Sequence, residues 1–432
     1  MKVFNLLLIL IFTCLITTPI NSQWISIENY SVPGSKPEVQ LISSDATSSI
    51  IKVDLPGYML DHFLYKNKSY YSIDIGEEAI TTEVGMPEIP HIAKILAIPD
   101  NGSVSVEVIE TGTKSVVSGF NIVPARNSWK EGNPETEYIE NSDFYKNGII
   151  YPNEIVRVDE PVIFRDFRLA RVSIFPIRYS PSKNEIEAFS SVTVKINYSS
   201  GGGENIKTTP QRKIASSFDK IYRTMIFNYD EVIRSRYIGD EETIGDLMLC
   251  IMPDAYVNTF SAYKDWKNLS GIEMVVKTFS EIGATSNTPD VIKNYIANAY
   301  HNWLKPPTHI LLVGDAGVAP TKNYTSPYDG YTFANEDYFV EIDGNDFFPE
   351  MMIGRFTNQN TSTLQILINK FIGYEKTPYL RITPGLKKHW FVLTVSIHLR
   401  DRLKELLDNI CLSMAVSQKL IQCMMVIPVQ VM

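Results

Sequence analysis

The sequence has few cysteines, few histidines and no long apolar run beyond its first residues. Only 4 of its 432 residues are Cys and 6 are His. Cys14 lies in an N-terminal apolar segment, and the remaining Cys250, Cys411 and Cys423 form an odd, sparse set that excludes a disulfide-stapled scaffold. The histidines include no set with the spacing of metal ligands, which argues against a zinc hydrolase.

Positive charge is also scarce. The chain carries 40 Lys and Arg against 49 Asp and Glu, for a net charge of -9. Nucleic-acid partners are bound by clusters of Lys and Arg, which this sequence lacks, so a nucleic-acid partner is excluded. A composition of 44% hydrophobic and 21% charged residues is typical of a soluble protein, and the length predicts about two to three domains with their own cores.

The first residues form the one strongly apolar stretch. Met1-Lys2 precedes an apolar run over residues 3–16, which predicts a secretory signal peptide over residues 1–22 with cleavage near Ser22-Gln23. A membrane anchor is the alternative, but the run is shorter than the roughly 20 residues that a spanning helix needs. We therefore expect a secreted protein with no membrane span in the mature chain.

Residues 23–200 have the pattern of an all-β domain. Short runs of β-branched and aromatic residues alternate at period two and are separated by Gly, Pro and Asn, which indicates half-buried antiparallel strands. The clearest runs are 103–109, 156–158, 169–174 and 191–197. We expect a β-sandwich-like domain, for which a carbohydrate- or protein-binding sandwich is a neutral alternative.

Residues 201–245 connect this domain to the next one. The glycine-rich stretch 199–204 predicts a flexible hinge. Apolar residues at helical spacing over 210–236 predict one or two helices.

From residue 246 the pattern changes to alternating strands and helices. We expect strands at 246–252, 272–277, 309–315, 337–343, 351–355 and 390–396, and helices at 254–269, 288–303, 361–374 and 400–412. Asp254 is the expected cap of the first helix, and Thr288 followed by Pro289 opens the second. Short connections predict a right-handed, mainly parallel sheet with helices on both faces. The fold class is thus α+β multidomain, with a β-rich domain followed by an α/β domain.

Two motifs in the α/β region carry the most specific signal. A buried-strand pattern ends in Gly314-Asp315, where an open α/β sheet delivers side chains to a crevice. Further along, the acidic turn 343–346 precedes Pro349-Glu350 and a strand that ends in Ile353-Gly-Arg355. The combination closely resembles the catalytic domain of gingipain-type cysteine peptidases.

The resemblance implies a caspase-like fold, a nucleophilic Cys and a His at successive strand ends, and a secreted bacterial precursor. Residues from 24 to about 240 would be a propeptide that masks the active site, and 246–432 a partial peptidase domain. The implied partners are a protein or peptide substrate and the chain's own propeptide. Cleavage at Arg212-Lys213 or at Arg234 to Arg236 would suit maturation, although solvated helix charges explain the same residues.

Glu350 is the site residue that the motif match assigns. It stands where the family places the acid that orients the catalytic His, and a solvated turn charge is the alternative. Asp315 has three interpretations: it binds a metal, supports the site, or caps the sheet end.

Asp343, Asn345 and Asp346 offer hard oxygens at a spacing that calcium loops use, and secreted relatives carry calcium. An Asp/Asn/Gly turn between two strands explains the same residues without an ion. The chemistry of a thiol peptidase requires no cofactor.

The His and Cys of the family have no match here, so nucleophile and base stay unassigned. In relatives the His precedes a Gly, and no His of this chain does. Cys250 lies inside a predicted strand, where a buried small residue is usual. The tail 387–432 departs from the family pattern, as a truncated, frame-shifted or divergent domain would, and reading past Met432 would decide. The alternative function is a non-catalytic secreted binding or inhibitory module.

Overall fold

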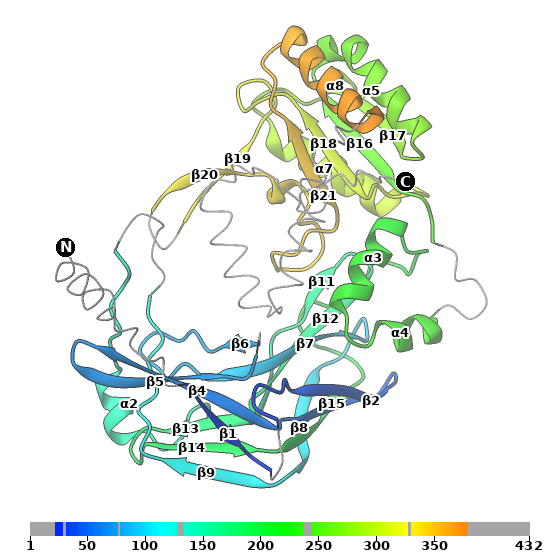
Figure 1. Cartoon of the computed structure of the whole chain (residues 1–432). Coiled ribbons are helices and arrows are strands. Elements are labelled where there is room, and N and C mark those ends of the chain that lie inside the picture. The colour runs from blue at the N-terminus through cyan, green and yellow to red at the C-terminus, as the bar shows by residue number, and fades with distance from the viewer. Residues whose placement is uncertain are drawn as a thin grey trace, which may run out of the picture.

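The computed structural model describes residues 22–28, 32–76, 78–127, 134–236, 243–326 and 330–377. These fall into an N-terminal domain up to residue 236 and an α/β domain from residue 243 (Figure 1). Most of the predicted signal peptide, the predicted strand 390–396, the predicted helix 400–412, and Cys411 and Cys423 lie outside the described residues. Among the described residues, no helix has both the length and the apolar character to cross a membrane.

The N-terminal domain is built from antiparallel strands. They are β1 (Ser22–Ser26), β2 (Glu38–Ser44), β3 (Ser48–Asp54), β4 (Gly57–Tyr65), β5 (Lys68–Asp74), β6 (Ala79–Ile80), β7 (Pro90–Ile98), β8 (Val104–Thr111), β9 (Lys114–Ser118), β10 (Val156–Val158), β11 (Val162–Phe164), β12 (Phe167–Ile174), β13 (Ile177–Ser180), β14 (Glu185–Phe189) and β15 (Ser191–Tyr198), with one short helix α2 (Ser142–Asn147). The sheet orders are β1-β4-β5, β10-β12-β7-β6 with β11 on β12, β13-β14-β9, and β2-β3-β15-β8. The four predicted strands are thus confirmed.

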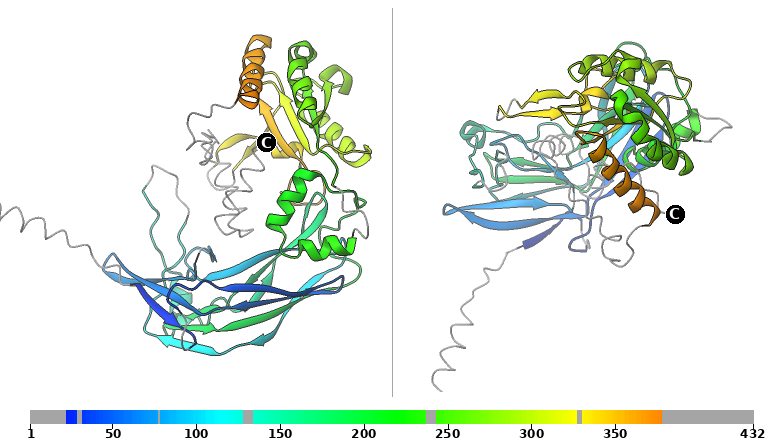
Figure 2. Two further views of the ribbon diagram at one scale, coloured as in Figure 1. Left: turned by 45° about the vertical axis from the view of Figure 1, so that its right-hand side comes forward. Right: turned by 90° about the horizontal axis from the view of Figure 1, so that it is seen from above.

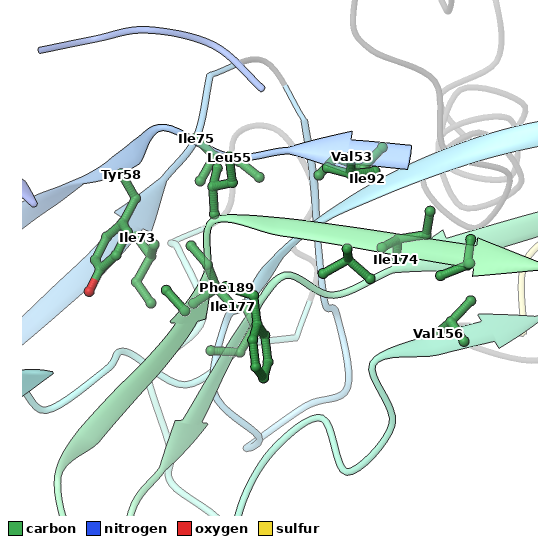
Figure 3. Close-up of a cluster of buried hydrophobic side chains, with 14 of the residues drawn as sticks. Val53, Leu55, Tyr58, Ile73, Ile75, Ile92, Val156, Ile174, Ile177 and Phe189 are labelled. Carbon is green, nitrogen blue, oxygen red and sulfur yellow. The ribbon is translucent and has the colours of Figure 1, made fainter. Parts of the chain in front are cut away.

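These sheets share one apolar core (Figure 3). Along β15, Val192, Val194 and Ile196 are fully buried while the residues between them are partly exposed, as period-two patterning requires. Val53 on β3 and Ile174 on β12 pack into the same cluster. Each such side chain stabilises the fold by about 1.5–3 kcal/mol through burial. The domain differs from the predicted β-sandwich-like arrangement in that its strands are divided among several sheets.

Two helices follow, α3 (Ser216–Met225) and α4 (Tyr229–Arg236). Their apolar faces pack on the outer face of β7 and β12 in a second core that also takes in Phe348 of the α/β domain. The two-helix interpretation of 210–236 is therefore confirmed. Figure 2 shows both helices lying between the sheets of the two domains.

The predicted flexible hinge at 199–204 is instead held in place. The Gly202 carbonyl accepts a hydrogen bond from Gly102 N at 2.7 Å, and the buried Arg168 donates to the Glu204 carbonyl at 2.6 Å. Residues 201–203 all have positive φ angles, which glycine adopts without strain. Composition predicted mobility, whereas the glycines are needed for the path of the chain.

The α/β domain has a parallel sheet of order β17-β16-β18-β21. Its elements are β16 (Leu247–Met252), η1 (Asp254–Tyr256), α5 (Val257–Leu269), β17 (Glu273–Thr278), α6 (Phe279–Ile282), α7 (Pro289–Asn302), β18 (His309–Val313), the hairpin β19 (Lys322–Thr325) and β20 (Thr332–Asn335), η2 (Asp337–Phe339), β21 (Met352–Phe356) and α8 (Thr361–Lys376). Leu249 faces α6 and α7, and Cys250 faces α5 and α8. The predicted parallel sheet with helices on both faces is confirmed within these residues.

Three local predictions fare differently. Residues 337–343 are not a strand but the short turn η2 and a loop, because Phe339 and Val340 turn together into the core beside α7. Asp254 does not cap the helix that follows it, since the N-cap of α5 is Tyr256; its carboxylate accepts instead from Ser280 N and Oγ in the first turn of α6. Thr288 does occupy the N-cap of α7 with Pro289 after it.

Candidate active site

Glu350 lies in the loop between η2 and β21 and is completely buried. Its Oε2 accepts hydrogen bonds from the backbone N–H groups of Ile342 at 2.6 Å and Asp343 at 3.2 Å. Its Oε1 is buried and has no hydrogen-bond partner among the described residues. The pKa of Glu350 is raised to about 9, mainly by burial; the two N–H donors oppose the rise, and the nearby Asp343 and Asp346 add to it. The solvated-turn interpretation is therefore wrong.

The acidic turn 343–346 is occupied by hydrogen bonds. Asp343 pairs through Oδ1 with His301 Nε2 at 2.8 Å and through Oδ2 with the hydroxyl of Thr209. Asp346 accepts from Ile163 N at 2.8 Å and from Phe348 N at 2.9 Å. Burial raises the pKa of Asp346.

These contacts bear on the calcium prediction. Calcium takes six to eight oxygen ligands, whereas all four carboxylate oxygens of Asp343 and Asp346 already accept hydrogen bonds. The part of the chain that the structure describes holds no cluster of three or more His, Cys, Asp or Glu arranged for a metal. Asn345 contributes its backbone N–H to Asn205 at 2.8 Å. Calcium binding by this turn stays a prediction, in which the ion would have to share these oxygens with the present hydrogen bonds.

Asp315 lies at the carboxyl ends of the parallel strands, opposite the end at which Glu350 lies. Strands β18 and β21 run parallel with His309 opposite Met352 and Val313 opposite Phe356, so Glu350 precedes one strand and Asp315 follows the other. The Asp315 carboxylate accepts from Gly317 N at 3.1 Å within its own turn. The structure thus brings Glu350 and the acidic turn together and separates them from Asp315, whose contacts are those of a sheet-end cap.

Arg355 is a residue whose contacts the motif alone did not reveal. Its guanidinium binds both carboxylate oxygens of Glu336 at 2.8 Å and donates to the carbonyls of Gly314, Ala319 and Pro320. It therefore fastens the loop after β18 to β21. The only sequence signal was its place in Ile-Gly-Arg.

Within the part of the chain that the structure describes, no histidine pairs with Cys250 as a catalytic dyad. Cys250 is the one free cysteine among the described residues, and complete burial raises the pKa of its thiol. His309 begins β18 as predicted, and burial lowers its pKa to about 4. His301, near the end of α7, contacts Asp343 and is part of the acidic turn's network. Sequence reasoning missed that last contact, since it joins two distant loops.

Comparison with known families gives two successive matches. The family model Propeptide_C25 matches residues 29–237, and that of Peptidase family C25 matches residues 242–399. The boundary between them falls in the segment between α4 and β16.

Curated relatives match across both regions. Gingipain R2 of Porphyromonas gingivalis is 25% identical over 349 residues, which cover 79% of this chain and 45% of that protein. Gingipain R1 of the same species is 27% identical over 353 residues, covering 79% and 34%, and Lys-gingipain is 25% identical over 332 residues, covering 72% and 18%. The chain spans less than half the length of the curated relatives it matches.

Solved structures of this group are also similar. A complex of Porphyromonas gingivalis RgpB pro- and mature domains matches at 20% identity with a TM-score of 0.41, covering 45% of this chain and 100% of that chain. The Arg-specific cysteine proteinase gingipain R matches at 27% identity with a TM-score of 0.27, covering 31% and 29%. With a propeptide region and a peptidase region matched in succession, this chain belongs to the gingipain-type cysteine peptidases, as a precursor.

Proposed function

We propose that the chain belongs to the precursor of a secreted bacterial cysteine endopeptidase. The N-terminal domain acts as the propeptide, and the α/β domain is the front part of a caspase-like catalytic domain. The substrate is a protein or peptide, and the reaction uses a thiol nucleophile with a His base. The predicted signal peptide accounts for secretion or display at the cell surface.

The succession of a propeptide match and a peptidase match along the chain is the observation that carries this proposal. A buried carboxylate oxygen without a donor, such as Oε1 of Glu350 among the described residues, is costly and rare in native proteins. An imidazole N–H is a suitable donor, and a carboxylate that accepts it fixes the tautomer and orientation of the His. The motif match proposes Glu350 as this acid, but the residue precedes β21 at the amino ends of the parallel strands, opposite the carboxyl ends where the family's His and Cys belong. The geometry therefore does not support this role for Glu350.

Two basic sites compete as maturation sites. Arg212 donates to the Tyr300 carbonyl at 2.7 Å and its guanidinium stacks on the Tyr300 ring at 4.6 Å. Arg234 lies in the last turn of α4 with its side chain 68% exposed. Because proteolysis favours exposed chain ends and loops, we assign cleavage to the end of α4 rather than to Arg212-Lys213.

Hydrolysis of a mixed peptide library under reducing conditions tests the proposal. A chain without the family's His and Cys should cleave nothing. Any cleavage that does occur should be abolished by iodoacetamide and unchanged by Cys250→Ala, because a fully buried thiol cannot reach substrate. Glu350→Gln tests the motif match: a fall in kcat/KM of about 100-fold or more, the scale typical of acid–base partners, would support a His-orienting role, and an unchanged kcat/KM would agree with its place at the amino ends of the strands. Cleavage that survives alkylation would overturn the thiol mechanism.

The second candidate is a non-catalytic secreted binding or inhibitory module. One observation favours it: Cys250, the one cysteine among the described residues, is completely buried and so cannot act on a substrate. This alternative predicts no hydrolysis under any condition, together with inhibition of an added gingipain-type peptidase by the intact chain.

A further inference from the structure

The N-terminal domain reaches the α/β domain through the tip of one hairpin. Strands β11 and β12 pair so that Phe164 lies opposite Phe167, which leaves Arg165 and Asp166 as a two-residue turn. Arg165 has a φ of 49°, as tight hairpin turns require. In Figure 1 this hairpin and α3 lie between the sheets of the two domains.

The Arg165 side chain is buried across the domain boundary, with 4% of it exposed. Its Nη1 donates to the carbonyls of Pro307 at 2.9 Å and Glu350 at 2.8 Å. Its guanidinium lies 4.7 Å from the centre of the Phe218 ring and 5.5 Å from that of Tyr300. The Tyr300 hydroxyl in turn donates to the Arg165 carbonyl at 3.2 Å. The ion pair of Arg165 with the adjacent Asp166, at 3.7 Å, stays within the N-terminal domain, whereas both hydrogen bonds of its guanidinium reach the other domain.

A second element of the N-terminal domain runs beside the hairpin, over residues 205–212. Asn205 accepts from Asn345 N, and the Thr209 hydroxyl donates to Asp343. Arg212 binds the Tyr300 carbonyl. The turn 343–346 therefore has hydrogen bonds both with the hairpin, through Ile163 N, and with this segment, through Asn205 and Thr209.

A small apolar contact completes the surface. Phe164, at the end of β11, meets Phe348 with ring centres 5.8 Å apart in an edge-on arrangement. Such pairs contribute beyond their buried area. A buried Arg and aromatic anchors surrounded by weaker polar contacts are typical of the centre of a protein interface.

We propose that Arg165 is the anchor by which the N-terminal domain binds the α/β domain, and that this contact keeps the two associated after the chain between them is cut. The inference rests on the proposed function only in treating the N-terminal domain as a propeptide. Both hydrogen-bond acceptors for the Arg165 guanidinium are backbone carbonyls, so this group recognises the path of the chain at Pro307 and Glu350.

The test uses the full chain with a recognition site for a specific protease placed in the segment 237–242. The folded chain is cut there, and the affinity of the two pieces is measured by dissociation kinetics and size-exclusion chromatography. Wild-type pieces should elute together. Arg165→Asn keeps a residue that tolerates the turn's positive φ and removes the guanidinium, and it should raise Kd on the order of 10- to 100-fold.

The matched control is Arg178→Asn. Arg178 is also a partly buried Arg of the N-terminal domain, but its contacts with Glu187, Asn153 and Phe189 stay within that domain. The control should leave Kd within about twofold, as expected for a site away from the interface. Should Arg165→Asn not fold, Tyr300→Phe removes only the hydroxyl and should raise Kd by roughly 3- to 10-fold.

Two outcomes overturn the proposal. One is wild-type pieces that separate on cutting. The other is Arg165 and Tyr300 variants that bind as tightly as the Arg178 control. Because the measurement needs no hydrolysis, its failure is independent of failure of the peptidase assay.

Discussion

The charged side chains at the two ends of the parallel strands find their partners in different domains. At the amino end of β21, Asp343 and Asp346 accept hydrogen bonds from the N-terminal domain, next to the buried Glu350. At the carboxyl end of β21, Arg355 binds Glu336 and carbonyls of its own domain.

The difference shows that one motif serves two purposes. The short strand β21 joins Pro349-Glu350 at one end to Arg355 at the other. The Arg355 end is a self-contained part of the α/β fold. The Glu350 end is completed by another domain, so release of that domain would expose its carboxyl groups to water.

Arg355→Ala is expected to have the largest effect. It removes a nearly buried guanidinium, 8% exposed, and leaves several carbonyls without donors, which should lower the free energy of unfolding by about 3 kcal/mol. Urea unfolding measures the change. Arg355→Lys should recover only part of the loss, because an ammonium cannot bind Glu336 through two parallel bonds. Equal stability of the Ala variant and the wild type would contradict the conclusion that Arg355 stabilises the α/β fold through these hydrogen bonds.

Glu350→Gln should change the pH dependence of stability. Burial raises the pKa of this carboxyl from 4.5 to about 9, so the folded state binds the proton more tightly than the unfolded state. Its contribution is fully present below pH 4.5 and is lost as the pH rises toward 9, by at most about 1.4 kcal/mol per pH unit. The amide that replaces the carboxyl does not titrate. The free energy of unfolding of the wild type, minus that of the variant, should therefore decrease as the pH rises from 4.5 to about 9. Parallel stability curves for the two proteins would sink this prediction.

Asp315→Ala should have a small effect, under about 1 kcal/mol, because a partly exposed carboxylate that accepts one local N–H contributes little. Thermal unfolding of the variant measures it. A loss as large as that of Arg355→Ala would show that Asp315 supports more than its own turn.

Calcium should have the smallest effect on the intact chain. The oxygens of Asp343 and Asp346 are engaged while the N-terminal domain is docked, so millimolar calcium and EDTA should give the same unfolding temperature. After the chain is cut between the domains, calcium should instead weaken their association by competing for these oxygens. A rise in unfolding temperature of the intact chain that Asp343→Asn abolishes would refute this expectation.

Much of the fold could be predicted because the local periodicity of apolar residues indicates which side chains of an element are buried. Alternation over 191–197 and the continuous apolar run at 309–313 each report which faces of a strand are covered, and both strands formed as expected. Residues 337–343 failed because the same composition suits a loop whose Phe339 and Val340 are buried side by side. The hinge at 199–204 failed because glycine content indicates permitted angles and not mobility.

The sequence by itself determined the family, the order of the two domains and the identity of Glu350 as the residue to examine. Only the tertiary structure decided that Glu350 and Asp315 lie at opposite ends of the parallel strands, that the acidic turn is a docking surface, and that Arg165 reaches the Glu350 carbonyl from 185 positions away. The physical reason is the separation along the chain over which each effect acts. Periodicity and turn chemistry act over a few residues, whereas desolvation and hydrogen bonding at a domain boundary depend on which distant surfaces meet.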